Sequence, residues 1–544
     1  MGSINHHYAP MDLSHHINSK SKARHPSPLK DIIKFMGYDG MVSLAGGLPH
    51  PSLFPLEQVK FDCLTPSASL SNDRKVGSAV VDPLSLTVGR GSSPGDLDLT
   101  QFLQYGSGSG NRQLIELCKE LTEKVHAPPC KYDSVLHIGN TNAWAKVVGL
   151  LCEDDDIVIV EEFTYPSAQA LWIPLGIKAV SVSADTEGIQ SNKLRDLLTT
   201  WDAKSRGAKR PKVIYLVSVG SNPTGVTISA QRRREIYDLC VEFDLVIVED
   251  DPYYFLQYPG YQPSSGKAVF QPKATNDFLK SLVPSFLSMD TQGRVIRLES
   301  FSKTIFPGLR MGYFIANPVF IERLLRASEV ETQDPAGLSE AFVLSLLNRW
   351  GIDGYLTWLQ NLQFQYQTRR NWLLDAFYAN FTVLPAAESP LPTAQGLVVC
   401  IESKADGGLR PVFSFVDPEA GMFMWTKFYF QDVKRFSEIE SKPVEDPEQT
   451  FADELWKAWA TELVLLTPGS YYHPWQGADK VTTKARGAEP RTAHFRFSFA
   501  TPSRGKLGVR IDQPTELDLT KSNNEHKMPS GEMAGPTHVQ VLPR

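Results

Sequence analysis

A lysine lies in the segment "RLESFSKTIFPGLRMGYF", between two apolar runs that are typical of buried strands. Lys303 follows Ser300 and Ser302 and precedes Arg310. A lysine amine can bond covalently to an aldehyde or carry a proton, and hydroxyls with a guanidinium suit a phosphate. The alternative is an ordinary solvated loop lysine, and this segment alone does not decide between the two.

Polar and aromatic side chains also follow four other strand-like segments. These segments are "VLHIG", "DIVIVEE", "VIYLVSVGS" and "DLVIVE", and the residues that follow them are Asn140 with Thr141, Tyr165, Asn222, and Asp250 with Tyr253. Taken singly, Asp250 could be a metal-binding acid, "NPTG" a simple turn and Tyr165 a core residue. Because ligands of open α/β sheets bind outside the carboxyl ends of strands, we expect all of them to share one site with Lys303.

The elements that must position these residues alternate between strands and helices. In "SAQRRREIYDLCVEF" the apolar residues Ile236, Leu239 and Cys240 recur at helical spacing, with Arg233 on the polar, solvated side. A strand precedes and another follows, which predicts a βαβ unit. The fold class is therefore α/β, with a mainly parallel, helix-flanked sheet over roughly 105–330 and a smaller α+β unit after it.

The chain divides into five predicted regions. We expect a flexible tail over 1–25, in which His15 and His16 are not metal ligands. Residues 26–100 form an N-terminal arm and part of the small domain, with an irregular loop over 65–100. The large domain covers 101–340, and the small domain covers 341–510 with an irregular insertion at 384–417. The polar segment 511–544 is predicted to be disordered.

Composition excludes several classes of protein. The net charge of −6 over 544 residues provides no basic surface for nucleic acid. Six scattered cysteines without a C-x-x-C pair predict neither disulfides nor a metal site. No apolar run is long enough to span a membrane and no secretory signal is evident, so we expect a cytoplasmic protein. The phosphate loop of nucleotide hydrolases is also absent.

Four motifs together carry a family resemblance. "SNPTG", "EDDPYYF", "SFSKTIFPGLRMG" and "HFRFSFA", in this order, resemble pyridoxal-phosphate-dependent aminotransferases of fold type I. "VSLAGGLPHPSLFP" and "GMFMW" resemble the subgroup that contains fungal aromatic aminotransferases and mammalian kynurenine/2-aminoadipate aminotransferases. The resemblance covers about residues 26–510, apart from the two irregular segments.

The resemblance implies a role for each candidate residue. Lys303 would hold pyridoxal 5'-phosphate covalently and move the proton, and Asp250 would face the pyridine nitrogen. Asn222 and Tyr253 would bind the ring oxygen. The other implied contacts are Tyr165 stacked on the ring; Asn140, Thr141, Ser300, Ser302 and Arg310 at the phosphate, with Tyr105 from a partner subunit; and Arg496, Gly47 and Asn222 at the substrate. A homodimer with shared active sites follows from the Tyr105 contact.

The implied reaction moves the amino group of an aromatic L-amino acid (tyrosine, phenylalanine or tryptophan) to a 2-oxo acid such as 2-oxoglutarate. A preference for 2-aminoadipate or kynurenine is an alternative, and so is a carbon–sulfur lyase or an aminocyclopropane-carboxylate synthase, because the cofactor supports several reactions. A non-catalytic regulator would need an N-terminal helix-turn-helix. Residues 1–70 are instead rich in proline and loop-like.

Overall fold

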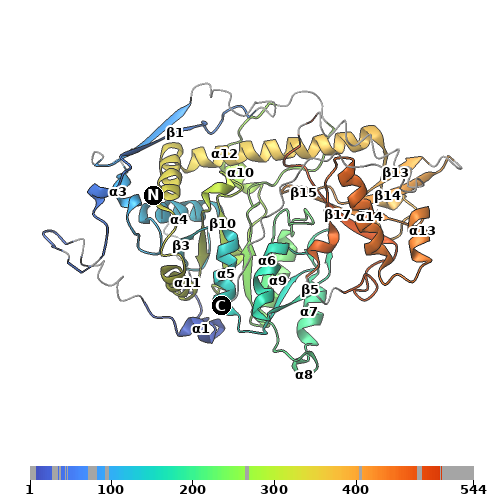
Figure 1. The fold of residues 1–544 in the computed structure, drawn as a ribbon, viewed down its shortest axis with the longest axis horizontal. Coiled ribbons are helices and arrows are strands. Elements are labelled where there is room, and N and C mark those ends of the chain that lie inside the picture. The colour runs from blue at the N-terminus through green and yellow to red at the C-terminus, as the bar shows by residue number, and fades with distance from the viewer. Residues whose placement is uncertain are drawn as a thin grey trace, which may run out of the picture.

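The computed structural model describes residues 8–26, 35, 38–42, 44–45, 47–70, 83–91, 97–263, 269–402, 407–474, 481–502 and 504. The predicted disordered segment 511–544 lies outside the described residues, as do the first seven residues of the predicted N-terminal tail. Two large sheets dominate the fold, and a long helix runs from one to the other along the top of the view in Figure 1.

The first sheet has seven strands and is mainly parallel, as predicted. β11 alone runs antiparallel to its neighbours, and register places Leu298 of β10 opposite Asp250 of β9. In spatial order the strands are β3 (Asp133–His137), β11 (Gly312–Ala316), β10 (Val295–Ser300), β9 (Val246–Asp250), β8 (Val213–Leu216), β4 (Ile157–Glu161) and β5 (Lys178–Val182).

Helices cover both faces of this sheet. Alternate residues of β9 belong to separate apolar clusters, Ile247 to one and Val248 to the other, because successive side chains of a strand point to opposite faces. The helices of this part are α4 (Arg112–His126), α5 (Asn140–Leu151), α6 (Pro166–Trp172), α7 (Ser191–Thr199), α8 (Ala203–Arg206), α9 (Ala230–Glu242), α10 (Thr275–Lys280) and α11 (Pro318–Glu331), with a small hairpin of β6 (Ala184–Asp185) and β7 (Gly188–Ile189).

The helix predicted between β8 and β9 is confirmed as α9, but the solvated position predicted for Arg233 is wrong. Its side chain is fully buried, and its Nη1 lies 3.2 Å from Glu249 Oε1. Its Nη2 also donates to the backbone oxygen of Ser218 at 2.8 Å. A buried acid on β9 therefore has its counter-charge on α9, which helical periodicity alone does not reveal.

The second sheet is antiparallel and lies at the right of Figure 1, with α13 (Lys434–Glu440) and α14 (Pro447–Thr461) packed beside it. The long helix α12 (Gly337–Asn380) leads into it and is interrupted at Gly351, where φ is 67°. In spatial order the strands are β12 (Thr382–Pro385), β13 (Leu397–Glu402), β14 (Leu409–Phe415), β15 (Phe423–Tyr429), β17 (Thr492–Ser498) and β16 (Thr467–Pro468).

The irregular structure predicted over 384–417 is wrong for the two strands within that segment. β13 and β14 lie within it and pair antiparallel, with a register shift between Val399 and Cys400. Val398, Val399 and Cys400 are buried, so the segment completes the sheet. Prolines and glycines near these strands favour turns and loops, so the sequence pattern predicts a loop where the strands form.

The N-terminal part of the chain is more ordered than predicted. Within the predicted flexible tail, α1 (Ser19–Lys22) packs against α5 and α11, and Leu13 and Ile17 are buried. The Asn18 amide donates to the backbone oxygen of Gly149 at 2.9 Å. The segment predicted as an irregular loop, 65–100, includes β2 (Leu84–Gly89), which pairs with β1 (Gln58–Cys63), and the start of α3 (Leu99–Leu103).

No helix in the described ranges is both long enough and apolar enough to cross a membrane.

Candidate active site

A cavity of about 400 Å³ opens at the carboxyl ends of β10, β9, β8 and β4, between the two sheets. It brings together all the candidate site residues predicted from the sequence except Tyr105 and Gly47. The predicted residues that line it are Asn140, Thr141, Tyr165, Asn222, Asp250, Tyr253, Ser300, Ser302, Lys303, Arg310 and Arg496. Side chains that are distant in the chain thus meet at one sheet edge, as the parallel topology requires.

Asp250 lies at the inner end of this cavity, with both carboxylate oxygens accepting hydrogen bonds. Asn140 Nδ2 donates to Oδ1 at 2.7 Å, and the Tyr215 hydroxyl donates to Oδ2 at 2.7 Å. Burial raises the pKa of Asp250, and the two hydrogen bonds oppose that rise. The two hydrogen bonds therefore fix the orientation of the carboxylate and stabilise its negative charge.

Lys303 follows β10 directly, in the turn that the sequence places between two strands. Burial and the neighbouring Arg310 charge lower the pKa of its amine, so a larger fraction is unprotonated near neutral pH. Arg310 Nη1 donates to the Pro307 backbone oxygen at 2.9 Å and lies 3.4 Å from Ser302 Oγ. The Ser302 backbone N–H donates to Ser300 Oγ at 3.1 Å, so this turn gathers hydroxyls and a cation at one end of the cavity.

Gly139 makes room for Arg310 at the same end. Its φ is 101°, a conformation that other residues rarely adopt, and a Cβ at this position would collide with Arg310 Nη2. Gly139 is also the N-cap of α5, so Asn140 and Thr141 occupy the first turn of that helix. Unpaired N–H groups of a helix start beside a guanidinium favour an anion here.

Arg496 extends from β17 of the second sheet toward the first. Its Nη1 donates to Asn222 Oδ1 at 2.6 Å and its Nη2 to Thr467 Oγ1 at 3.2 Å. The guanidinium carbon lies 4.2 Å from the centre of the Phe423 ring, within cation–π distance. Burial lowers the pKa of Arg496, which nevertheless stays charged because arginine is so strongly basic.

Two predicted residues do not line the cavity in this chain. The Tyr105 side chain is 60% exposed, and it follows the short helix α3 at some remove in sequence from the other site residues. Gly47 is exposed, and a Cβ at its position would have open space around it. Their implied contacts with cofactor and substrate stay predictions.

Sequence reasoning missed several lining residues, chiefly Tyr215, Trp144 and Phe423. Tyr215 sits in the four-residue strand β8, where an aromatic among aliphatic residues is ordinarily a core residue. Its ring contacts Trp144 at 4.6 Å between centroids, and Phe423 packs edge-on to Tyr253 at 5.8 Å. The register of β8 beside β9 turns the Tyr215 hydroxyl toward Asp250, and no local sequence signal indicates this.

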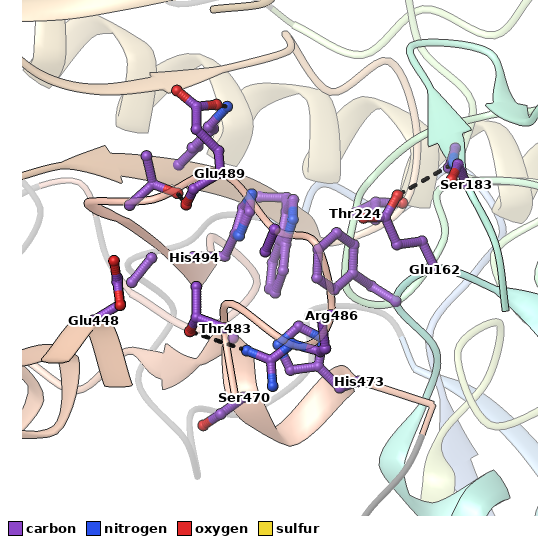
Figure 2. Close-up of a pocket in the computed structure, with 18 of the residues that line it drawn as sticks. Glu162, Ser183, Thr224, Glu448, Ser470, His473, Thr483, Arg486, Glu489 and His494 are labelled. Atoms are coloured by element: carbon purple, nitrogen blue, oxygen red, sulfur yellow. Dashed lines mark hydrogen bonds and ion pairs between the residues drawn. The ribbon is translucent and has the colours of Figure 1, made fainter. Parts of the chain in front are cut away.

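A second cavity, of about 560 Å³, is larger but contains none of the candidate residues. Figure 2 shows Glu162 and Thr224 on one side of it, Glu489 on the other and His473 near Arg486 below. Burial lowers the pKa of His494 to about 3 and that of His473 to about 4, so both imidazoles are neutral. Most of the candidate residues, Lys303 among them, line the smaller cavity.

Comparisons with known proteins identify the family of the chain. The profile of the family described as "Aminotransferase class I and II" matches residues 96–391, more than half of the chain. The chain belongs to the class I and II aminotransferase family. The resemblance inferred from the motifs is thereby confirmed.

Individual relatives resemble the chain over most of their length. An aromatic amino acid aminotransferase of Schizosaccharomyces pombe is 39% identical, covering 80% of this chain and 87% of that protein. An L-tyrosine:2-oxoglutarate aminotransferase of Serpula lacrymans is 31% identical, covering 85% and 84%. The crystal structure of aminotransferase Aro8 from Candida albicans has a TM-score of 0.77 at 33% identity, covering 93% of this chain and 97% of that one. The chain is an aminotransferase, and its fold is that of its family.

Proposed function

We propose that this aminotransferase uses pyridoxal 5'-phosphate to move the amino group of an aromatic L-amino acid to 2-oxoglutarate. The observation that carries the proposal is the convergence of Lys303, Asp250 and Arg496 on one cavity. Relatives named aromatic amino acid aminotransferase and L-tyrosine:2-oxoglutarate aminotransferase support the choice of donor and acceptor.

The residues present fit this cofactor. An amine at Lys303 faces the same cavity as an acid at Asp250, and hydroxyls with a guanidinium gather near Gly139, where a side chain would displace Arg310. Lys303 would bond to the aldehyde, Asp250 would face the ring nitrogen, and Ser300, Ser302 and Arg310 would hold the phosphate with Thr141. When bound, the cofactor supplies an electron-accepting ring and the aldehyde at which amino groups are exchanged.

Asn140 would act mainly through Asp250. We expected it among the phosphate contacts, but its side-chain amide donates to Asp250 at 2.7 Å and to the Leu298 backbone oxygen at 3.0 Å. Its backbone N–H, in the first turn of α5, stays available for an anion. Asn140 and Tyr215 would together keep Asp250 anionic. The negative charge of Asp250 would then favour the protonated form of the ring nitrogen that it faces.

Lys303 would transfer the proton. Its lowered pKa leaves a larger share of the amine free to accept a proton from the substrate α-carbon and then to return it. A base is most effective when its pKa lies near the working pH, and burial shifts Lys303 in that direction. Tyr253, which is 5% exposed, and Asn222 would bind the ring oxygen, and Tyr165 would stack on the ring.

Arg496 would bind the substrate α-carboxylate, since a guanidinium pairs with a carboxylate through two parallel hydrogen bonds. Its Nη1 contact with Asn222 and Nη2 contact with Thr467 hold the group in position beforehand. Orientation of the substrate in this way places its α-carbon toward Lys303. Gly47 would contribute to the substrate site from the N-terminal region.

A homodimer with shared active sites is part of the proposal. Tyr105 is 60% exposed and does not line its own cavity, which suits a residue that reaches the phosphate of a partner subunit. Arg310 is likewise exposed at the mouth of the cavity, where a partner would cover it.

A panel of amino donors with 2-oxoglutarate tests the proposal. We expect kcat/KM for tyrosine, phenylalanine and tryptophan to exceed that for 2-aminoadipate and kynurenine by at least about tenfold, a difference of roughly 1.4 kcal/mol in transition-state binding. A mouse relative named kynurenine/alpha-aminoadipate aminotransferase, 29% identical, makes these two the informative competitors. Higher kcat/KM for either competitor would replace the proposed substrate class.

A further inference from the structure

Two histidines and an aspartate meet outside the cavity that contains the active-site residues, at the amino-terminal end of β9, whereas Asp250 lies at its carboxyl end. His15 Nε2 lies 2.7 Å from Asp244 Oδ2, and His16 Nε2 lies 3.1 Å from Asp244 Oδ1. The histidines belong to a short 3-10 helix, Ser14–His16, near the N-terminus, and Asp244 lies in the turn between α9 and β9. Their potential ligand atoms all lie within 4.8 Å of one another.

The surroundings fix Asp244 in this position. It adopts a φ of 57°, a left-handed conformation that is uncommon for residues other than glycine and asparagine. Arg294 Nη1 donates to its Oδ1 at 2.7 Å. Arg294 therefore orients the carboxylate through one oxygen and leaves the other, Oδ2, directed at His15.

The two histidines differ in their freedom to move. The His16 side chain is only 3% exposed, and the neighbouring Leu13 and Ile17 are buried in the core, so this imidazole is held in place. The His15 side chain is 56% exposed, and that of Asp244 is 46% exposed. The cluster thus has one rigid imidazole, one movable imidazole and an open side toward solvent.

We propose that His15, His16 and Asp244 bind one divalent transition-metal ion, for which zinc is the best match. Imidazole nitrogens and one carboxylate oxygen are common zinc ligands at about 2.0–2.2 Å, and water can take the fourth position on the open side. Four-coordinate zinc needs ligand atoms roughly 3–4 Å apart. His15 Nε2 now lies 2.7 Å from Asp244 Oδ2, so the exposed His15 side chain would have to move outward slightly when the ion binds. Arg294, bonded to the carboxylate oxygen that does not bind the metal, acts as an outer-shell orienting group.

The simpler alternative is that both imidazoles donate N–H groups to Asp244 without a metal. Both arrangements join the N-terminal segment to the turn after α9, and both explain the short distances. They differ in one respect. In a metal site the affinity for zinc depends on each of the three side chains, whereas the hydrogen-bonded arrangement binds no zinc. The metal would add a cross-link between segments 228 residues apart.

Zinc titration of the full-length, cofactor-loaded protein tests the proposal. Because His6 and His7 could bind zinc by themselves, all proteins carry His6→Ala and His7→Ala. Isothermal titration with zinc chloride, after removal of metals with EDTA, is expected to show one zinc ion per chain that depends on the cluster. His15→Ala and Asp244→Asn should each weaken this binding by at least about tenfold.

His25→Ala is the matched control, since His25 is an exposed histidine of the same N-terminal segment outside the cluster. It should keep both the zinc stoichiometry and the zinc-induced rise in Tm, and His15→Ala should lose both. Unchanged zinc affinity in His15→Ala, or no zinc binding in the parent protein, would overturn the proposal in favour of the hydrogen-bonded alternative. His15 is exposed enough for its variant to fold, so this comparison decides even if Asp244→Asn does not fold.

Discussion

Tyr215→Phe is the most informative perturbation of the active site. It removes only the hydroxyl that donates to Asp250 Oδ2 at 2.7 Å and keeps the ring packed on Trp144. Asp250 is 8% exposed, so water replaces the lost donor poorly. The variant should raise the pKa of Asp250 further above its ordinary value, because burial then acts with one opposing hydrogen bond fewer.

The size of the effect follows from the strength of a hydrogen bond to a charged group, about 1.5–3 kcal/mol. At about 1.4 kcal/mol for each pKa unit, this corresponds to a rise of about 1–2 units in the pKa of Asp250. A more basic Asp250 draws the proton away from the group it faces. If the whole loss appears in the transition state, kcat falls by about 10- to 150-fold.

Steady-state transamination and titration with pyridoxal 5'-phosphate measure the two consequences, a lower kcat and weaker cofactor binding. Tyr237→Phe is the matched control, because the buried Tyr237 hydroxyl on α9 donates to Asp290, which lies before β10 and outside the cavity, at 3.0 Å. The control should lower Tm but leave kcat and cofactor affinity unchanged. Kinetics and cofactor affinity of Tyr215→Phe within twofold of the parent protein would refute the reasoning.

Three further perturbations probe other parts of the account. Arg496→Lys should lower kcat/KM for both amino and oxo acids by about 100-fold because the two-point contact is lost. Arg491→Lys, at a half-exposed arginine just before β17, should not, and equal effects would contradict the assignment. Gly139→Ala should weaken cofactor binding at least about tenfold through its collision with Arg310, whereas Gly149→Ala has open space and should bind normally. Burial raises the pKa of Glu161 to about 7 from 4.5, so the folded state binds this proton more tightly than the unfolded state does. The free energy of unfolding therefore falls by about 3 kcal/mol as the pH rises from 4.5 to 7. Glu161→Gln should therefore raise Tm at pH 8 and much less at pH 4.5, and an equal change at both pH values would count against this linkage.

The strand ends were predictable because each strand of the first sheet has a strong local signal. β9 and β10 are short, fully buried runs, and polar residues follow directly after each. Parallel topology then determines that Asp250 and Lys303 share an edge, so their proximity follows from a fold-level rule. Eleven predicted residues line the cavity. Their prediction depended on this rule more than on any single motif.

Features that depend on pairing between distant segments were not predictable. Tyr215 has the burial and sequence context of a core residue, and only the β8–β9 register directs its hydroxyl to Asp250. His15 and His16 lie in a polar N-terminal segment that gives no local hint of Asp244. Arg233 appeared solvated because helical spacing identifies an apolar face but not an ion pair beneath it.

Chemical trapping of the cofactor tests the central claim most directly. Reduction of the loaded protein with sodium borohydride, followed by digestion and mass spectrometry, should place the cofactor on Lys303 in a single peptide. Lys303→Ala should fold with an unchanged Tm in the absence of cofactor, take up no label and show no transamination. A label on any other lysine, or transamination retained by Lys303→Ala, would contradict the account.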